Sequence, residues 1–226
     1  MRDDITSIPI SEVFEPMDGC PVCRLHDMLN ERIAVYITGA AMMEPDIRQE
    51  TNRLGFSHTH YRRLLKQQKR LPLALMLESH LAEVEKTAFG SGLGGKTKKV
   101  KGGEKTTCYM CDSIDRNMQH FISNICHIWD KEEDFRKLYA QQPMFCLPHC
   151  RQLAEASVSE IPRKHQPEFV RITAEITRNY LRELGGDVSH FCKMFDYRNN
   201  TPNKDWGNSK DSIERAITFM TAEKPE

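Results

Sequence analysis

Apolar residues recur every three or four positions along several stretches of this 226-residue chain, which is the spacing of one buried helix face. Two such stripes share a period, one after residue 20 and one after residue 108. The first contains Val22, Leu25, Leu29, Ile33 and Tyr36, and the second contains Met110, Ile114, Met118, Phe121, Ile125 and Ile128. No stretch shows the clear period-2 alternation of a half-buried strand. We therefore expect an all-α fold.

Proline and glycine mark the ends of several predicted helices. Pro45 suits the first turn of a helix that Gly55 can close. The clearest stripe covers residues 167–184, and the pair Gly185-Gly186 is expected to stop that helix. Further helices are expected at residues 58–66, 71–87, 147–158 and 209–220.

The chain contains an internal repeat. Each copy reads Cys-x-x-Cys followed, after a helical stretch, by Phe-(Ser or Cys)-x-x-His. The copies are Cys20, Cys23, Phe56, Ser57 and His60, and then Cys108, Cys111, Phe145, Cys146 and His149. Between the two motifs lie nearly equal spans, because Ser57 follows Cys23 by 34 residues and Cys146 follows Cys111 by 35. A duplicated helical unit explains this agreement.

Residues 90–107, rich in glycine and lysine, separate the copies and are expected to form a flexible linker. This predicts a first helical unit at residues 1–89 and a second at 108–226, packed as one body. The second unit is expected to end in an aromatic-anchored strap, from Phe195 to Asp211, and a C-terminal helix.

The linker contains a match to the phosphate-binding pattern G-x-x-x-x-G-K-[ST], at Gly90 to Thr97. Phosphate binding by this motif needs a buried strand before the loop and a helix after it. The residues before Gly90 belong to a predicted amphipathic helix instead. A nucleotide ligand is therefore not expected.

The second copy of the repeat carries a complete set of metal-binding side chains. Cys108, Cys111, Cys146 and His149 form a Cys3His set, with each pair three residues apart at a helix start. Four soft nitrogen and sulfur donors favour zinc, and a closed four-ligand zinc site is usually structural. We therefore predict a structural zinc in the second repeat.

The first copy departs from this pattern, because Ser57 stands where the second copy has a cysteine. Three outcomes are open for its donors Cys20, Cys23 and His60. His58 could supply the fourth ligand, the site could bind no metal, or the fourth position could stay open to water as in some catalytic zinc sites.

The remaining cysteines are expected to pack rather than to bind metal. Cys150 follows Cys146 by four residues, but its counterpart in the first repeat is Tyr61, so it is assigned to packing. Cys126 and Cys192 belong to no motif and are expected in the core.

Charge and hydropathy exclude several functional classes. Lys+Arg and Asp+Glu both number 32, which disfavours a dedicated nucleic-acid or anionic-membrane binder. No apolar run reaches the length of a membrane span, and Asp3 and Asp4 stand where a signal peptide would place its basic start. We expect a cytoplasmic protein, in which the eight cysteines stay reduced and paired spacings indicate metal ligands.

The motifs resemble those of an uncharacterised bacterial family, a domain of unknown function found widely in Firmicutes. Its members carry Cys-Pro-x-Cys and Gly-Phe-Cys-x-x-His motifs in repeated form, with a Phe-Asp-Tyr-Arg segment near the end. The matching residues are Cys20, Cys23, Gly55, Phe56, His60, Cys108, Cys111, Phe145, Cys146, His149 and Phe195 to Arg198. Ser57 departs from the family's cysteine. The resemblance implies a bacterial origin and metal binding and brings no known activity.

Three functional hypotheses follow. The first is a non-enzymatic helical protein that is stabilised by one or two zinc ions and acts through protein–protein contact. The second is a metal- or thiol-dependent enzyme that works at the site altered by Ser57, marked by a zinc-bound water beside a carboxylate. The third is a cytosolic thiol or metal sensor, in which Cys-x-x-Cys pairs release zinc on oxidation, marked by exposed cysteines of low pKa.

Overall fold

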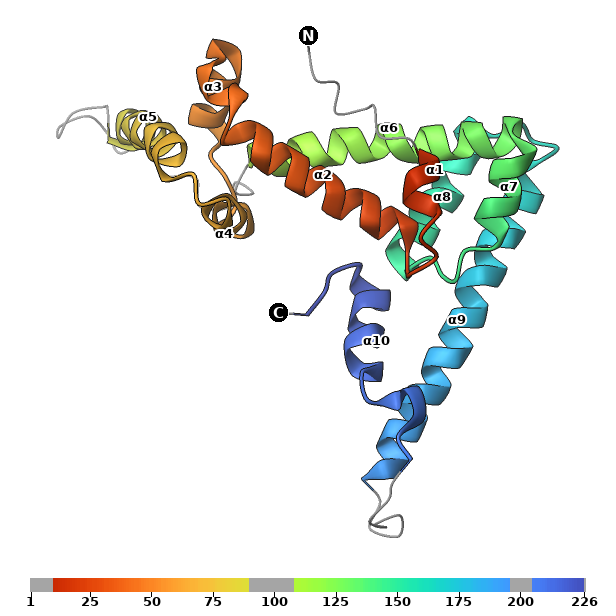
Figure 1. The fold of residues 1–226 in the computed structure, drawn as a ribbon. Coiled ribbons are helices and arrows are strands. Elements are labelled where there is room, and N and C mark those ends of the chain that lie inside the picture. The colour runs from red at the N-terminus through yellow and green to blue at the C-terminus, as the bar shows by residue number, and fades with distance from the viewer. Residues whose placement is uncertain (1–9, 90–107, 196–204, 226) are drawn as a thin grey trace. The chain divides into compact units, whose positions relative to one another are not determined.

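The computed structural model describes residues 10–89, 108–195 and 205–225 (Figure 1). Every regular element in these ranges is a helix, which confirms the all-α prediction. The elements are α1 (Ile10–Phe14), α2 (Pro21–Ile37), η2 (Ala40–Met43), α3 (Pro45–Leu54), α4 (His58–Lys66), α5 (Arg70–Phe89), α6 (Tyr109–Lys131), α7 (Glu133–Ala140), α8 (Leu147–Glu160), α9 (Gln166–Met194), η4 (Gly207–Ser209) and α10 (Ser212–Thr221). None of the described helices combines the length and apolar character needed to cross a bilayer.

Two of the sequence features lie outside the described residues. The expected linker at residues 90–107, with its G-x-x-x-x-G-K-[ST] match, is one of them. The other is the Asp196 to Arg198 part of the C-terminal motif.

The helices repeat in the same order in the two halves of the sequence. Helices α2 to α5 correspond to α6 to α9, and each copy places its two metal-ligand motifs at helix starts. Cys20 and Cys108 directly precede α2 and α6, while Ser57 and Cys146 directly precede α4 and α8. The ligand motifs therefore sit at fixed points of a four-helix repeat.

Packing divides the chain into two compact units whose limits differ from those of the repeats. Of the described residues, unit 1 contains 26–89 and 108–118, and unit 2 contains 10–25, 119–195 and 205–225. Unit 1 therefore combines most of the first repeat with the start of α6, and unit 2 combines most of the second repeat with the start of α2. The boundaries 1–89 and 108–226 follow the duplication instead, because spacing alone does not show which helices pack together.

Aromatic side chains fill the core of unit 2. Tyr139 of α7 lies 4.8 Å from Phe145 and 5.3 Å from Phe169, measured between ring centroids. Its hydroxyl is 2.7 Å from the Thr173 hydroxyl, which gives this buried polar atom a partner. Phe14 of the short helix α1 packs edge-on against Phe135 at 5.0 Å. These contacts hold α1, α7 and α9 around the start of α8.

Helix α9 continues through the glycine pair at which it was expected to stop, so that prediction is wrong. The helix ends at Met194, because packing against η4 and α10 outweighs the low helix propensity of glycine. Phe191, beyond the pair, contacts Trp206 at a ring-centroid distance of 5.7 Å. The Arg215 side chain of α10 also reaches Asp187, the residue after Gly186.

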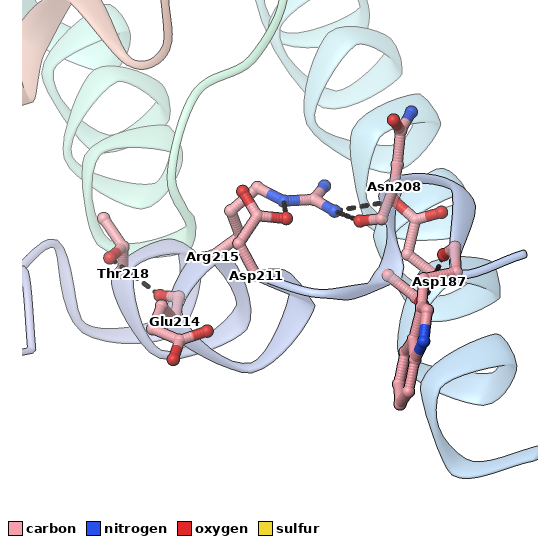
Figure 2. A network of polar contacts seen from close by, with 8 residues as sticks. Asp187, Asn208, Asp211, Glu214, Arg215 and Thr218 are labelled. Atoms are coloured by element: carbon pink, nitrogen blue, oxygen red, sulfur yellow. Dashed lines mark hydrogen bonds and ion pairs between the residues drawn. The ribbon is translucent and has the colours of Figure 1, made fainter. Parts of the chain in front are cut away.

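Arg215 joins α10 to α9 through a polar network (Figure 2). Its guanidinium donates to Asp187 at 2.9 Å, to Asp211 at 3.0 Å and to the Asn208 carbonyl. Burial lowers the pKa of Arg215, but hydrogen bonds to Asp187, Asp211 and Tyr180 raise it by more, so the side chain stays charged. The network therefore ties the C-terminal helix to α9 in the part where the glycine pair weakens helix propensity.

We expect Arg215→Met to lower the free energy of unfolding by about 1–3 kcal/mol, since it removes several charge-assisted hydrogen bonds at once. Urea denaturation of the full chain measures this loss. Arg171→Met is the control. Arg171 and Glu175 form an ion pair within α9, and their side chains are 58% and 52% exposed. That change should cost less than about 0.5 kcal/mol, and an equal loss in both variants would contradict the role of Arg215.

Gly55 ends α3 as predicted and occupies a conformation that other residues avoid. Its φ is 62° and its ψ is −158°. A Cβ atom at this position would lie 2.6 Å from Nε2 of His80. The Gly55 carbonyl accepts a hydrogen bond of 3.0 Å from the backbone of Tyr109, the residue after Cys108. Gly55 therefore links the end of α3 to the start of α6.

Gly55→Ala is expected to lower the free energy of unfolding by at least about 1–3 kcal/mol, from backbone strain alone. Gly185→Ala should have the opposite sign, because that glycine is helical and nothing lies within 4 Å of an added Cβ. It should stabilise the protein by about 0.5–1 kcal/mol. Chemical denaturation of both variants tests the pair, and a neutral Gly55→Ala would refute the strain argument.

Candidate metal centres

The structure brings the predicted ligands together in two clusters, but it pairs the motifs across the repeats. The unit 2 cluster consists of Cys20, Cys23, Cys146 and His149, and the unit 1 cluster consists of His60, Cys108 and Cys111. Within each cluster the ligand atoms lie within 4.8 Å of one another, so both groups could hold a metal ion. The expected grouping within each repeat is therefore wrong. Each Cys-x-x-Cys pair meets the histidine motif of the other copy.

Helix starts position all four side chains of the unit 2 cluster. Cys20 precedes α2 and Cys23 lies in its first turn, while Cys146 caps α8 and His149 lies in its first turn. Nδ1 of His149 is 3.0 Å from Sγ of Cys146, 3.3 Å from Sγ of Cys23 and 3.7 Å from Sγ of Cys20. The sulfurs of Cys23 and Cys146 are 3.5 Å apart.

These distances match the edges of a small tetrahedron. With Zn–S bonds of about 2.3 Å and Zn–N bonds of about 2.0–2.1 Å, tetrahedral sulfurs lie roughly 3.8 Å apart, and a sulfur and a nitrogen roughly 3.5 Å apart. The separations of 3.3, 3.5 and 3.7 Å lie within about 0.3 Å of these edges, and the 3.0 Å between Cys146 and His149 is shorter. Cys20, Cys146 and His149 are buried, which suits a closed site.

Hydrogen bonds within the unit 2 cluster favour one shared thiolate. Burial raises the pKa of Cys20, but hydrogen bonds from Cys146, Cys23 and His149 lower it by more. The pKa therefore lies well below its ordinary value. The pKa of Cys146 is raised to about 12, first by its hydrogen bond to Cys20. Cys23 also has a raised pKa, because it hydrogen-bonds to Cys146 and Cys20. A cation would relieve this competition by taking several thiolates at once.

The unit 1 cluster has three ligand atoms and a hydroxyl beside them. Nδ1 of His60 lies 3.2 Å from Sγ of Cys108 and 3.5 Å from Sγ of Cys111. Oγ of Ser57 is 3.0 Å from the same Nδ1 and 4.0 Å from Sγ of Cys111. Ser57 also caps α4, since its Oγ accepts the backbone N–H of His60 at 3.4 Å. The hydroxyl thus occupies the place that Cys146 takes in unit 2.

Electrostatics in the unit 1 cluster favour a thiolate at Cys108. Burial raises the pKa of this cysteine, but hydrogen bonds from His60, the Cys111 backbone and Ser57 lower it by more. The resulting pKa is about 6. Burial, together with the hydrogen bond and charge of Cys108, raises the pKa of Cys111 to about 11. One sulfur of the pair is thus prepared to bind a cation.

Asn30 of α2 fixes the orientation of His60 and was not predicted from the sequence. Its Oδ1 accepts from Nε2 of His60 at 3.0 Å, and its Nδ2 donates to the His26 carbonyl at 3.0 Å. The second bond determines which end of the amide faces the histidine. Nε2 therefore carries the hydrogen, and Nδ1 presents its lone pair to the cluster. The equivalent position in the second repeat is Met118, so a break in the repeat was the available signal.

Asn30→Ala is expected to weaken zinc binding at the unit 1 cluster by about 10–100-fold, the usual effect of losing an outer partner of a histidine ligand. Asn30→Asp should retain most of the affinity, because a carboxylate also accepts from Nε2. Competition with a chromophoric chelator measures both. Asn117→Ala is the control, since Asn117 of α6 bonds to the Ser113 carbonyl at 2.7 Å. Equal affinities for Asn30→Ala and the control would rule out the orienting role.

Other candidate residues lie apart from the clusters. The structure does not bring His58 to either group, and its side chain is exposed. Cys150 is half-buried and belongs to neither cluster, and Cys126 is buried as expected. Cys192 is exposed, so its assignment to the core is wrong. The reason is its place in the last turns of α9, beyond the glycine pair at which that helix was expected to end.

Comparison with known proteins adds little to the geometry. One model, described as a family of unknown function, matches residues 1–226. Neither the curated proteins nor the solved structures gave a match.

Proposed function

Because the chain belongs to DUF6062, a family of unknown function whose model covers residues 1–226, its role has to be inferred from the site, and we propose that it is a zinc-binding helical protein. In this proposal the zinc of the unit 2 cluster is structural. The observation that carries the proposal is the set of three sulfurs and one nitrogen whose ligand atoms all lie within 4.8 Å of one another.

Burial and chain connectivity support a structural role for this ion. Cys23 and Cys146 are 123 residues apart in sequence and 3.5 Å apart through their sulfurs. A metal ion bound there connects the start of α2 to the start of α8 within unit 2. Four protein ligands leave no position for a substrate, which is the usual arrangement of structural zinc.

We propose that the protein acts through contact with another protein. Large apolar side chains on the outside of α5 support this, with Leu71 at 69% and Leu81 at 63% exposure. Neither cluster contains a carboxylate among the described residues, which disfavours an enzyme that activates a zinc-bound water. A thiol sensor is disfavoured as well, because Cys20 and Cys108, the two cysteines whose pKa is lowered, are both buried.

The proposal places the protein in the bacterial cytoplasm. The resemblance of its motifs supports a bacterial origin. All eight cysteines of the chain are free thiols, which suits a reducing compartment.

Metal analysis of cysteine variants tests both the metal and the pairing. Cys20→Ser, Cys146→Ser and the double variant should each lose the same single zinc ion relative to the parent protein. If the ligands instead paired within each repeat, the two single variants would affect different sites and their losses would add. Cys150→Ser is the control and should keep the full metal content. Iron, or no bound metal in the parent protein, would overturn the proposal.

A further inference from the structure

The unit 1 cluster differs from the unit 2 cluster at one corner, and that corner has the same backbone in both. Ser57 has φ −68° and ψ 160°, while Cys146 has φ −65° and ψ 157°. Each residue directly precedes its helix, α4 or α8, and each is followed three positions later by the histidine ligand. The duplicated fold thus presents a thiolate in one unit and a hydroxyl in the other.

The Ser57 hydroxyl is already engaged by its neighbours. Its oxygen accepts the His60 backbone N–H at 3.4 Å and lies 3.0 Å from Nδ1 of the same histidine. A neutral serine hydroxyl is also a poor zinc ligand beside thiolates. The protein therefore supplies three strong donors in unit 1, and the fourth coordination position of a bound metal ion has no strong donor from the protein.

Exposure shows which edge of the cluster an outside ligand can reach. Cys108 and His60 are buried, at 1% and 7% exposure. Cys111 and Ser57 are half-buried, so the accessible edge runs between these two side chains. Because these two side chains are themselves half-buried, the edge favours a small molecule over a protein segment.

We propose that the unit 1 cluster binds zinc through Cys108, Cys111 and His60 and takes a small-molecule thiol as its fourth ligand at the Ser57 corner. This inference rests on the proposed zinc binding. Two thiolates and a neutral imidazole balance the charge of a divalent cation. One further thiolate reproduces the donor set of the unit 2 cluster. The incoming thiol releases its proton to solvent, its sulfur takes the open position, and a water molecule leaves.

A thiol fits this position better than a reactive water does. Hydrolysis by a zinc-bound water needs an acid or base in contact with that water. Among the described residues no carboxylate lies at ligand distance in the cluster, although the charge of Asp115 on α6 reaches Cys111. A soft thiolate needs no such partner. The Ser57 hydroxyl remains beside the bound sulfur as a hydrogen-bonding group.

The test uses the full-length protein loaded with cobalt(II), whose sulfur-to-metal charge-transfer absorption increases with the number of bound thiolates. Addition of 2-mercaptoethanol should increase this absorption by about one fifth, because the two clusters together hold five cysteines. Ethanol, its oxygen analogue, should leave the spectrum unchanged. Ser57→Cys is the matched variant, since a protein thiolate then fills the corner and added thiol should have no effect.

The other outcomes overturn either the inference or the proposed function, and they can be told apart. Two bound cobalt ions without a thiol response would show that the fourth position does not take a thiol. A response that persists in Ser57→Cys would place the thiol elsewhere. If one cobalt ion binds and it is lost in Cys146→Ser, the inference fails while the proposed structural site stands. Absence of metal from the unit 2 cluster would instead refute the proposed function.

Discussion

Removal of zinc from the unit 2 cluster is expected to unfold unit 2. Binding of structural zinc by small zinc-finger peptides contributes about 10–16 kcal/mol to folding. That is as large as the whole stability of a typical domain, about 5–15 kcal/mol. The metal-free cluster would also leave buried thiols and a buried imidazole to compete for few protons. The remaining aromatic core should not be sufficient to compensate for this loss.

Tryptophan fluorescence measures this unfolding selectively. The chain has two tryptophans, Trp129 and Trp206, and both belong to unit 2. Trp129 is fully buried and packs against Phe169 at 5.0 Å. A strong chelator should shift the emission to longer wavelength and lower the urea midpoint, and zinc should reverse both. Cys146→Ser should show the shift without chelator, whereas Cys150→Ser should resemble the parent. A chelated parent protein with unchanged emission and midpoint would contradict a structural zinc.

Ser57→Cys is expected to raise the zinc affinity of the unit 1 cluster by at least about 100-fold. Loss of an outer partner alone changes metal affinity by about 10–100-fold, and this change adds a direct ligand. The backbone at Ser57 already has the conformation of Cys146, so the new sulfur needs no rearrangement to reach the cluster. Competition with a chelator of known affinity, in the absence of added thiol, measures the gain.

The same substitution should have the opposite effect without metal. Ser57 caps α4, and loss of such a cap costs about 0.5–2 kcal/mol. Metal-free Ser57→Cys should therefore be less stable than the metal-free parent, while the zinc form should be more stable. His58→Ala is the control, because this exposed neighbour belongs to neither cluster. A loss of zinc affinity in His58→Ala would instead indicate that His58 is the fourth ligand of the unit 1 cluster.

Local chemistry explains why much of the fold was predictable. Pro45 and Gly55 bracket α3 as expected, because proline suits a first turn and glycine tolerates the conformation that ends the helix. The helix at residues 58–66 has the expected limits, since Ser57 is a good cap. The glycine pair did not predict the end of α9, because helix propensity is a local property and contacts from η4 and α10 determine the length of that helix.

The pairing of the metal ligands was not predictable from spacing. Both copies have nearly the same number of residues between their motifs, so the two possible pairings give the same pattern. Asn30 was hidden for another reason, because a polar residue within an apolar stripe has no assigned partner until His60 is placed beside it. The metal-ligand residues could thus be predicted from the sequence, whereas only the folded structure shows which of them lie together.

The crossed pairing of the ligands has a consequence during synthesis on the ribosome. Cys146 is synthesised 123 residues after Cys23, so the interval between the two cysteines is roughly 6–25 s at the usual rates of translation. In that interval His60 is already available, and so Cys20, Cys23 and His60 can capture zinc in the wrong combination. The weak hydroxyl at Ser57 then works in favour of the native protein, because it keeps this early set short of a fourth strong donor. A premature complex of this kind releases its metal more easily when the native partners emerge.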